Sequence, residues 1–170
     1  MPALAAIPVW VPFLLAALVA AGIRLSRSRE QAPGVALGLA LGMGALSLFG
    51  VVSGFGAALA PVAMWLLGMA AALTLGARVV VPRGLAFVAE RRRVFVPGSW
   101  WPLALMLGIF AIKFVLGAAA GMGTPVSGHS AVAAVAGFAL GLFSGGFAAR
   151  SAAVLRVARR GPVVAVAAAV

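Results

Sequence analysis

The stretch APGVALGLALGMGALSLFGVVSGFGAALAPVAMWLLGMAAALTLGA (32–77) contains no charged residue. Apolar segments of about 20 residues already cross a bilayer core of roughly 30 Å. One helix over this stretch would be about 69 Å long at ~1.5 Å per residue, more than twice what a span needs. The chain must therefore turn back, and the glycines and the proline of SGFGAALAP (53–61) mark the turn. We predict two membrane spans here, over about 34–52 and 57–77.

The other apolar segments predict three further spans. Hydrophobic residues make up 65% of the sequence and charged residues 9%. A soluble domain needs more polar surface than this composition provides. Three stretches match the length of a span: 3–23, 103–121 and 131–149. The predicted fold is an all-α integral membrane bundle of five transmembrane helices in one domain, 1–160. The apolar end, 161–170, is too short to span, and we expect a tail there.

The basic residues test this division independently. Apart from Lys113, they fall in three groups, within 24–29, 78–93 and 150–160. Five alternating spans place all three groups on one side of the membrane, and the positive-inside rule makes that side cytoplasmic. We therefore predict a multi-pass protein of the bacterial inner membrane, with its N-terminus outside and its C-terminus inside. The net charge of +11 then indicates loops that lie against anionic lipid headgroups, not a surface that binds nucleic acid.

One segment between the predicted third and fourth spans indicates structure outside the membrane. In GLAFVAERRRVFVPG (84–98), phenylalanine and valine flank AERR on both sides, and Pro97-Gly98 closes the second arm. We predict a short cytoplasmic β-hairpin over about 84–97, with an amphipathic interfacial helix as the alternative. Because an isolated two-stranded hairpin is marginal in water, this one should pack on helix ends or headgroups.

The next segment carries the most specific motif of the chain. In VPGSWWPLALMLGIFAIKFVLG (96–117), a Pro-Gly-Ser-Trp turn leads into a helix with Ile-Phe, then lysine with an aromatic residue, then glycine. In this pattern it resembles a family of small, uncharacterised bacterial multi-pass membrane proteins, a domain of unknown function. The likeness extends to PVWVPFLLAAL (8–18), LSLFGVVS (46–53) and LFSGGFAAR (142–150), although Phe114 stands where the resemblance implies tyrosine. The resemblance implies a membrane architecture and no activity.

Lys113 is the one charged residue inside a predicted span. It lies in the middle of 103–121, where a charge costs about 2.5–3.5 kcal/mol on insertion scales. Helical spacing places Gly117 and Gly121 on its side, and such a small-xxx-small pair lets another helix approach closely. We therefore expect Lys113 to face protein. Because both acids of the chain lie in cytoplasmic loops, Ser47, at a similar depth in the second span, is the predicted partner.

Three interpretations of Lys113 stay open. The first is a neutral or water-bridged lysine that fixes helix packing through hydrogen bonds to Ser47 and to backbone carbonyls. The second is a site for an anionic or carbonyl-bearing ligand, or a proton relay. The third is a pair with an acidic residue of another protein.

The only histidine lies in PVSGHS (125–130), which looks like the Ser-Gly-His element of membrane phosphatases of the phosphatidic-acid type. Those enzymes need a second histidine as nucleophile and an acid that orients it, and the sequence offers neither in a suitable place. We therefore interpret His129 as a polar residue of an outer loop or helix start. Without cysteines or an acid inside a span, the chain has no set of metal ligands, and we predict no metal and no cofactor.

Glycines four residues apart recur in the predicted spans, namely Gly38/Gly42, Gly50/Gly54, Gly117/Gly121 and Gly141/Gly145. Together they favour close helix packing, inside the chain or between copies, and the glycine-rich span 34–52 is the predicted central, most buried helix. We expect a non-enzymatic membrane protein, either an accessory subunit or a self-associating one, because one histidine, one lysine and no intramembrane acid are poor material for catalysis. The alternative is a small transporter or ligand-binding protein that uses Lys113.

Overall fold

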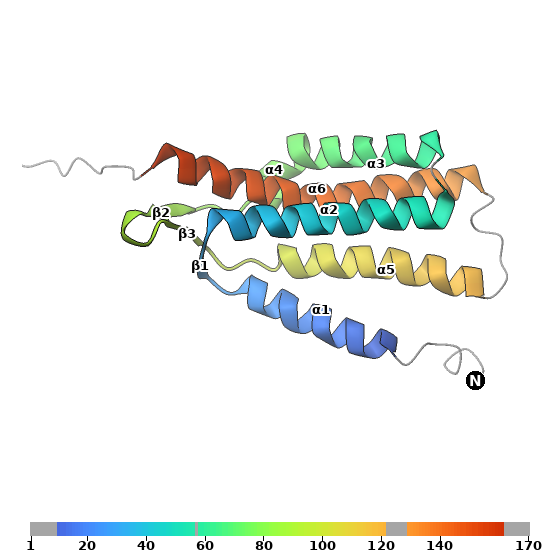
Figure 1. Ribbon diagram of the computed structural model, residues 1–170, viewed down its shortest axis with the longest axis horizontal. Helices are drawn as coiled ribbons and strands as arrows, with labels where there is room; N and C mark the ends of the chain where they lie inside the picture. The colour runs from blue at the N-terminus through green and yellow to red at the C-terminus, as the bar shows by residue number, and fades with distance from the viewer. Residues whose placement is uncertain (1–9, 57, 122–128, 162–170) are drawn as a thin grey trace, which may run out of the picture.

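The computed structural model describes residues 10–56, 58–121 and 129–161, which form a bundle of apolar helices with a small sheet at one end (Figure 1). Four helical segments are long and apolar enough to cross a membrane, and they are α2 (Pro33–Phe55), the continuous helix Leu59–Gly76, α5 (Trp101–Gly121) and α6 (Ser130–Arg160). A shorter apolar helix, α1 (Trp10–Ser26), precedes them. The start of the predicted span 3–23 and the predicted tail beyond Gly161 lie outside the described residues.

Proline and glycine set the two ends of α2. Pro33 is its first residue, where the missing N–H leaves no hydrogen bond unmade and the fixed φ suits a helix. Gly56, directly after the last residue, has a φ of 71°, which L side chains rarely adopt. The next helix, α3 (Leu59–Ala71), begins almost at once and continues through the π-helix η2 (Ala72–Gly76) into α4 (Ala77–Val80). The turn therefore falls inside the predicted segment 53–61.

The last helix, α6, occupies the centre of the bundle (Figure 1). It packs along α3 on one side and against α2 and α5 on others, whereas α1 packs against α5 at the edge. In the apolar 18-residue stretch of each helix, 50% of the residues are buried in α6 and only 17% in α2. The prediction that the span 34–52 is the central, most buried helix is therefore wrong. The number of glycines in a helix does not tell on which side of the helix they lie, and those of α2 lie mostly on its exposed side.

The sheet has three strands, one more than the predicted hairpin. Strands β2 (Ala86–Val88) and β3 (Arg93–Val96) pair antiparallel within the predicted segment 84–97, with a 3-10 turn between them. Strand β1 (Arg29–Gln31) pairs antiparallel with the other edge of β3, so that Glu30 lies opposite Phe95. Strand β1 was not predicted, because Arg-Glu-Gln has no apolar or β-branched residue that would indicate a strand.

Two groups of buried apolar side chains hold these elements together. The larger lies among α2, α3, α5 and α6 and includes Val51, Trp65, Leu105 and Leu140. The smaller joins the sheet to the ends of α2 and α6 and consists of Ala36, Val94, Val96 and Val154. The sheet thus leans on helix ends, as so short a sheet requires.

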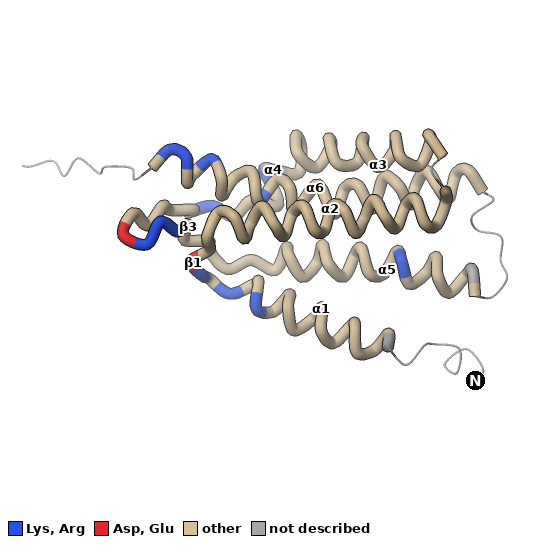
Figure 2. Tube along the Cα trace, viewed as in Figure 1, with Lys and Arg blue, Asp and Glu red and all other residues tan. Residues whose placement is uncertain are grey.

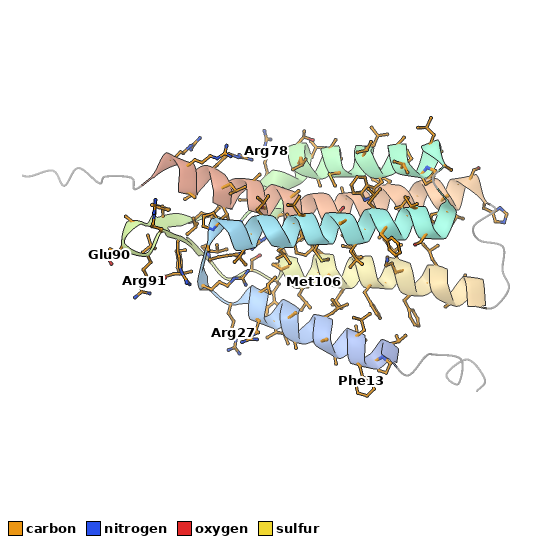
Figure 3. The ribbon with its side chains drawn as sticks, viewed as in Figure 1. Phe13, Arg27, Arg78, Glu90, Arg91 and Met106 are labelled. Atoms are coloured by element: carbon orange, nitrogen blue, oxygen red, sulfur yellow. The ribbon has the colours of Figure 1, made fainter. Side chains whose placement is uncertain are left out.

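The charges are distributed unevenly along the bundle (Figure 2). The described arginines lie in the half of the molecule that holds the sheet, and the blue segment on α5 lies in the other half. The sequence of α5 identifies this segment as Lys113. Figure 3 shows Arg27, Glu90 and Arg91 at the sheet end and Phe13 pointing outward from α1. On the surface of the sheet, Arg91 forms an ion pair with Glu30 at 3.2 Å. The arrangement separates a basic end from an apolar body.

Candidate functional site

Ser47 joins three helices, and its partners differ from the predicted one. Its hydroxyl is fully buried, donates to the backbone carbonyl of Leu140 at 3.0 Å and accepts the indole N–H of Trp65 at 3.0 Å. Since Leu140 belongs to α6 and Trp65 to α3, these two bonds tie both helices to α2. A buried indole needs an acceptor, and Ser47 supplies it. Ser47 thus donates its one hydroxyl proton inside the core, and among the described residues no hydrogen bond joins it to Lys113.

Lys113 is half-buried on α5, and its side chain lies against α2. A Cβ added to Gly50 would collide with Cε and Nζ of Lys113, so the lysine runs directly over the backbone of this glycine. On the same helix, the rings of Phe110 and Phe114 stack with their centroids 6.0 Å apart. The neighbour of Lys113 on α2 is therefore Gly50, less than one helical turn from the predicted Ser47.

Gly117 and Gly121 do not form the predicted helix contact within the described chain. Both are exposed, and no described atom lies within 4 Å of the place that a Cβ would take at either. Near this part of α5, an apolar groove of about 520 Å³ lies between α5 and α6, lined by residues such as Ile112, Val115 and Val135. The spacing of this pair suits close packing, but no described helix comes within contact distance of it.

The backbone-to-backbone contact of the bundle is instead between α6 and α3. Three glycines of α6 recur every four residues, and a Cβ on each would meet the backbone of α3: Gly137 at Pro61, Gly141 at Trp65 and Gly145 at Met69. The predicted pair Gly141/Gly145 is thus a packing contact inside the chain. Gly137 extends it by one turn and was missed, although the same spacing could have revealed it.

The second helix carries a similar series that meets nothing. Gly34, Gly38 and Gly42 of α2 recur every four residues, are exposed, and have no described atom within 4 Å of a possible Cβ. Apolar side chains border them, among them Val35 and Leu41, which are 63% and 64% exposed. We call these three glycines the outer glycine face of α2. No part of the described chain covers it.

Two arginines and a serine surround a small cavity at the sheet end. Arg150 on α6 donates through Nη1 to the carbonyl of Val80 at 2.7 Å and to the hydroxyl of Ser99 at 3.4 Å. Arg29 on β1 donates through Nη2 to the side-chain oxygen of Gln31 at 3.0 Å, and burial lowers the pKa of Arg29 below its ordinary value. Both arginines and Ser151 line the same cavity of about 30 Å³.

Sequence reasoning assigned these arginines only an orienting role. Arg29 and Arg150 are far apart in the chain, and they meet only because β1 pairs with β3 while α6 passes beside the sheet. No local sequence pattern indicates that these two arginines line the same cavity. The one available signal was that Arg150 follows directly on the predicted span 131–149, where a basic side chain starts at the edge of the apolar region.

His129 takes no part in these clusters. It is exposed and precedes α6 as its N-cap residue, without a capping hydrogen bond from its side chain. Most of the motif PVSGHS, residues 125–128, lies outside the described residues. Among the residues that the structure describes, no three histidine, aspartate or glutamate side chains gather as metal ligands would.

Comparisons with known proteins support the family resemblance inferred from the motif of residues 96–117. Residues 2–164, nearly the whole chain, match the model of one family, described as a family of unknown function (DUF6622). No curated protein and no solved structure matches the chain. The family model covers far more than half of the sequence, and it carries no activity, substrate or partner. The chain belongs to DUF6622, a family of unknown function, and its own apolar helices are typical of membrane proteins.

Proposed function

We propose that this chain is an integral protein of the bacterial inner membrane with five spans, its N-terminus outside and its sheet end in the cytoplasm. The support is the gathering of the arginines at the sheet end, since positive residues are retained on the cytoplasmic side. In this orientation the sheet lies at the inner membrane surface, and its arginines face anionic headgroups. Five alternating spans, with α1 as the first, also bring both loops of the opposite end to the outside.

Within that membrane, the proposed role is self-association without catalysis. The observation that carries this proposal is the outer glycine face of α2. In the same molecule, glycines at the same spacing on α6 meet the backbone of α3 directly. Lipid tails are as apolar as the helices, so contact in a membrane comes from close packing, which a row of glycines permits.

A second copy of the chain is the occupant that fits this face. Around Gly38 and Gly42 the face is free of charge, and its apolar borders Val35 and Leu41 can pack beside the crossing point. In a dimer with twofold symmetry the same patch occurs on both subunits and must complement itself. A glycine groove with apolar edges meets this condition, because each groove receives the edge of the other.

Crosslinking through single cysteines tests the association, and the chain has no cysteine of its own to interfere. Ala45→Cys introduces a thiol one turn beyond Gly42 on α2, and Leu66→Cys introduces one on the exposed side of α3. Upon oxidation in native membranes, we expect a covalent dimer from the first variant and a monomer from the second. Helices that touch at glycines bring the two Cα atoms within the roughly 4.4–6.8 Å that a disulfide spans.

Two leucine substitutions sharpen the experiment. Gly38→Leu should abolish the dimer of Ala45→Cys, because the new side chain fills the proposed groove. Gly117→Leu is the matched control, since Gly117 is an exposed glycine of α5 with equal space around it, and the dimer should persist. A product of Ala45→Cys with another protein would identify the chain as an accessory subunit. Equal crosslinking of Ala45→Cys and Leu66→Cys would refute a specific contact through α2.

The second candidate is a small ligand-binding or transport protein centred on Lys113. The observation in its favour is that this lysine is only half-buried and meets Gly50, a residue without a side chain that could pair with it. A charge at that depth is costly unless a ligand or a partner protein supplies an opposite charge. Labelling of Lys113 by a small aqueous amine reagent in intact membranes would favour this function, and the absence of labelling would count against it.

A further inference from the structure

The cavity at the sheet end contains a polar group that the fold does not use. Ser151 is one of the residues that line the cavity, and only 4% of it is exposed. Its buried hydroxyl has no hydrogen-bond partner among the described residues. Buried polar groups in proteins are nearly always paired, and an orphan usually marks a missing ligand or water. Ser151 therefore points to an occupant of this cavity.

The charge of the cavity restricts the chemistry of that occupant. Arg29 and Arg150 both line it, and they are close enough to repel each other. The cavity lining contains no acid, and Glu30, the acid nearest in sequence to Arg29, pairs with Arg91. Arg150 uses only Nη1 for its bonds to Val80 and Ser99, which leaves further guanidinium N–H groups to donate. Two guanidinium groups and a hydroxyl form a donor set for an oxyanion.

The size of the cavity limits how much of the occupant it can hold. A volume of about 30 Å³ admits about two water-sized groups at ~10–15 Å³ each. The two non-bridging oxygens of a phosphodiester fit this limit, whereas a whole metabolite does not. The remainder of the occupant must lie outside the cavity.

An adjoining groove provides that space. It has a volume of about 350 Å³ and shares Arg29, Gln31, Leu25 and Leu39 with the cavity. The groove lies between the end of α1 and the start of α2, where Arg24 and Arg29 form its basic part and Leu25, Val35 and Leu39 its apolar part. A basic pocket that continues into an apolar groove at the end of membrane helices matches a lipid, with its phosphate at one end and an acyl chain at the other.

We propose that this site binds a phospholipid of net negative charge. Its phosphate oxygens accept hydrogen bonds from Arg29, Arg150 and Ser151, and one acyl chain lies along Leu25 and Leu39. The inference rests on the proposed location in the membrane, which places the sheet end at the level of the inner headgroups. It narrows the general expectation that basic loops contact headgroups to one site, formed by Arg29, Arg150 and Ser151.

The test measures lipid binding to the full chain in detergent by native mass spectrometry, which depends neither on topology nor on self-association. Phosphatidylglycerol is the anionic probe, phosphatidylcholine the zwitterionic reference and inorganic phosphate the free oxyanion. We expect phosphatidylglycerol to bind at least about tenfold more tightly than phosphatidylcholine, since charge-assisted hydrogen bonds from two guanidinium groups favour a net anion. Inorganic phosphate should compete only at far higher concentration, because it gains nothing from the groove.

Three variants and a control locate the binding. Arg29→Gln and Arg150→Gln should each weaken phosphatidylglycerol binding about tenfold. Because Arg150 also holds the carbonyl of Val80, its variant can lose stability, and Ser151→Ala provides an independent measurement. That variant removes an unpaired hydroxyl, so lipid-free stability should stay constant while lipid binding falls about three- to tenfold. Arg156→Gln, an exposed arginine further along α6, is the matched control and should bind as the wild type does.

Each alternative outcome overturns a part of the proposal. An equal loss in Arg156→Gln would show diffuse attraction to the basic end. Unchanged binding in Ser151→Ala would leave the orphan hydroxyl without a role in the site. Inorganic phosphate that competes as well as phosphatidylglycerol would assign the cavity to a free oxyanion. A failed crosslink through α2 would not affect any of these results, so this site and the proposed association are tested separately.

Discussion

The same methyl group, added at two glycines, should change the stability of the bundle in opposite directions. In Gly141→Ala, the new Cβ would overlap the carbonyl oxygen of Trp65 and lie 2.8 Å from its carbonyl carbon. These are backbone atoms of α3, which cannot rotate away as the end of a side chain can. In Gly38→Ala, no described atom lies within 4 Å of the new Cβ. The two substitutions therefore differ in surroundings and not in chemistry.

The structure sets the size of the difference. Ordinary contact begins at about 3.4 Å, so a carbonyl carbon at 2.8 Å already requires α3 to move away from α6 by about half an ångström. Overpacking of a well-packed interior costs about 1–3 kcal/mol, and the displaced helix also loses dispersion contacts over neighbouring turns. We expect a loss of about 2–3 kcal/mol for Gly141→Ala. Gly38→Ala removes the backbone freedom of glycine within a helix and should gain up to about 1 kcal/mol.

The assay is unfolding of each variant by sodium dodecyl sulfate in mixed micelles, followed by tryptophan fluorescence and by circular dichroism. Dilution to monomer keeps a change in association at the face of Gly38 from entering the result. Gly50→Ala is a third point on the scale, because its Cβ would meet only the flexible end of Lys113, and it should cost less than Gly141→Ala. Equal stabilities of Gly141→Ala and Gly38→Ala would refute the backbone contact between α3 and α6.

Two further substitutions test the polar residues of the bundle. Ser47→Ala should lower the free energy of unfolding by about 1–3 kcal/mol, because the buried indole N–H of Trp65 loses its acceptor, and tryptophan fluorescence should shift with it; an unchanged spectrum would contradict the bond. Lys113→Met should keep or raise thermal stability in detergent, since it replaces a half-buried amine among apolar helices by an apolar side chain of similar length. A marked loss of stability in Lys113→Met would instead show that the lysine holds α5 against α2.

The positions of the apolar helices were largely predictable from the sequence. The predicted spans 34–52, 57–77 and 103–121 correspond to α2, to the continuous helix Leu59–Gly76 and to α5, within a few residues at either end. The reason is that span length is fixed by the membrane and that proline and glycine punctuate the turns. The last helix extends beyond the prediction, since α6 runs on past Ala149 to Arg160. Its final turns are basic, and hydropathy cannot tell a helix that leaves the membrane from a loop.

The direction in which each helix faces could not be predicted in the same way. In a soluble protein the buried side of a helix is apolar and the exposed side polar, so periodicity reports the core. A membrane helix is apolar all round, because lipid and protein interior are alike in polarity. Gly38 and Gly141 therefore look equivalent in the sequence, although one faces outward and the other meets Trp65. For the same reason Gly117 and Gly121 were assigned a packing role that no described neighbour fills.

The sequence position of an arginine indicates membrane orientation but not which other residues it meets. This explains why the proposed lipid site was not predicted. Counting the arginines by segment is enough to propose an orientation for the chain, because the positive-inside rule depends on which loop holds a charge and not on its neighbours. A binding site depends on which of those charges meet. Arg29 and Arg150 meet through the pairing of β1 with β3, and β1 is the one strand that the sequence did not indicate. The strand that was hardest to predict is thus the element that turns an orienting arginine into a ligand-binding one, and Arg29→Gln tests that step directly.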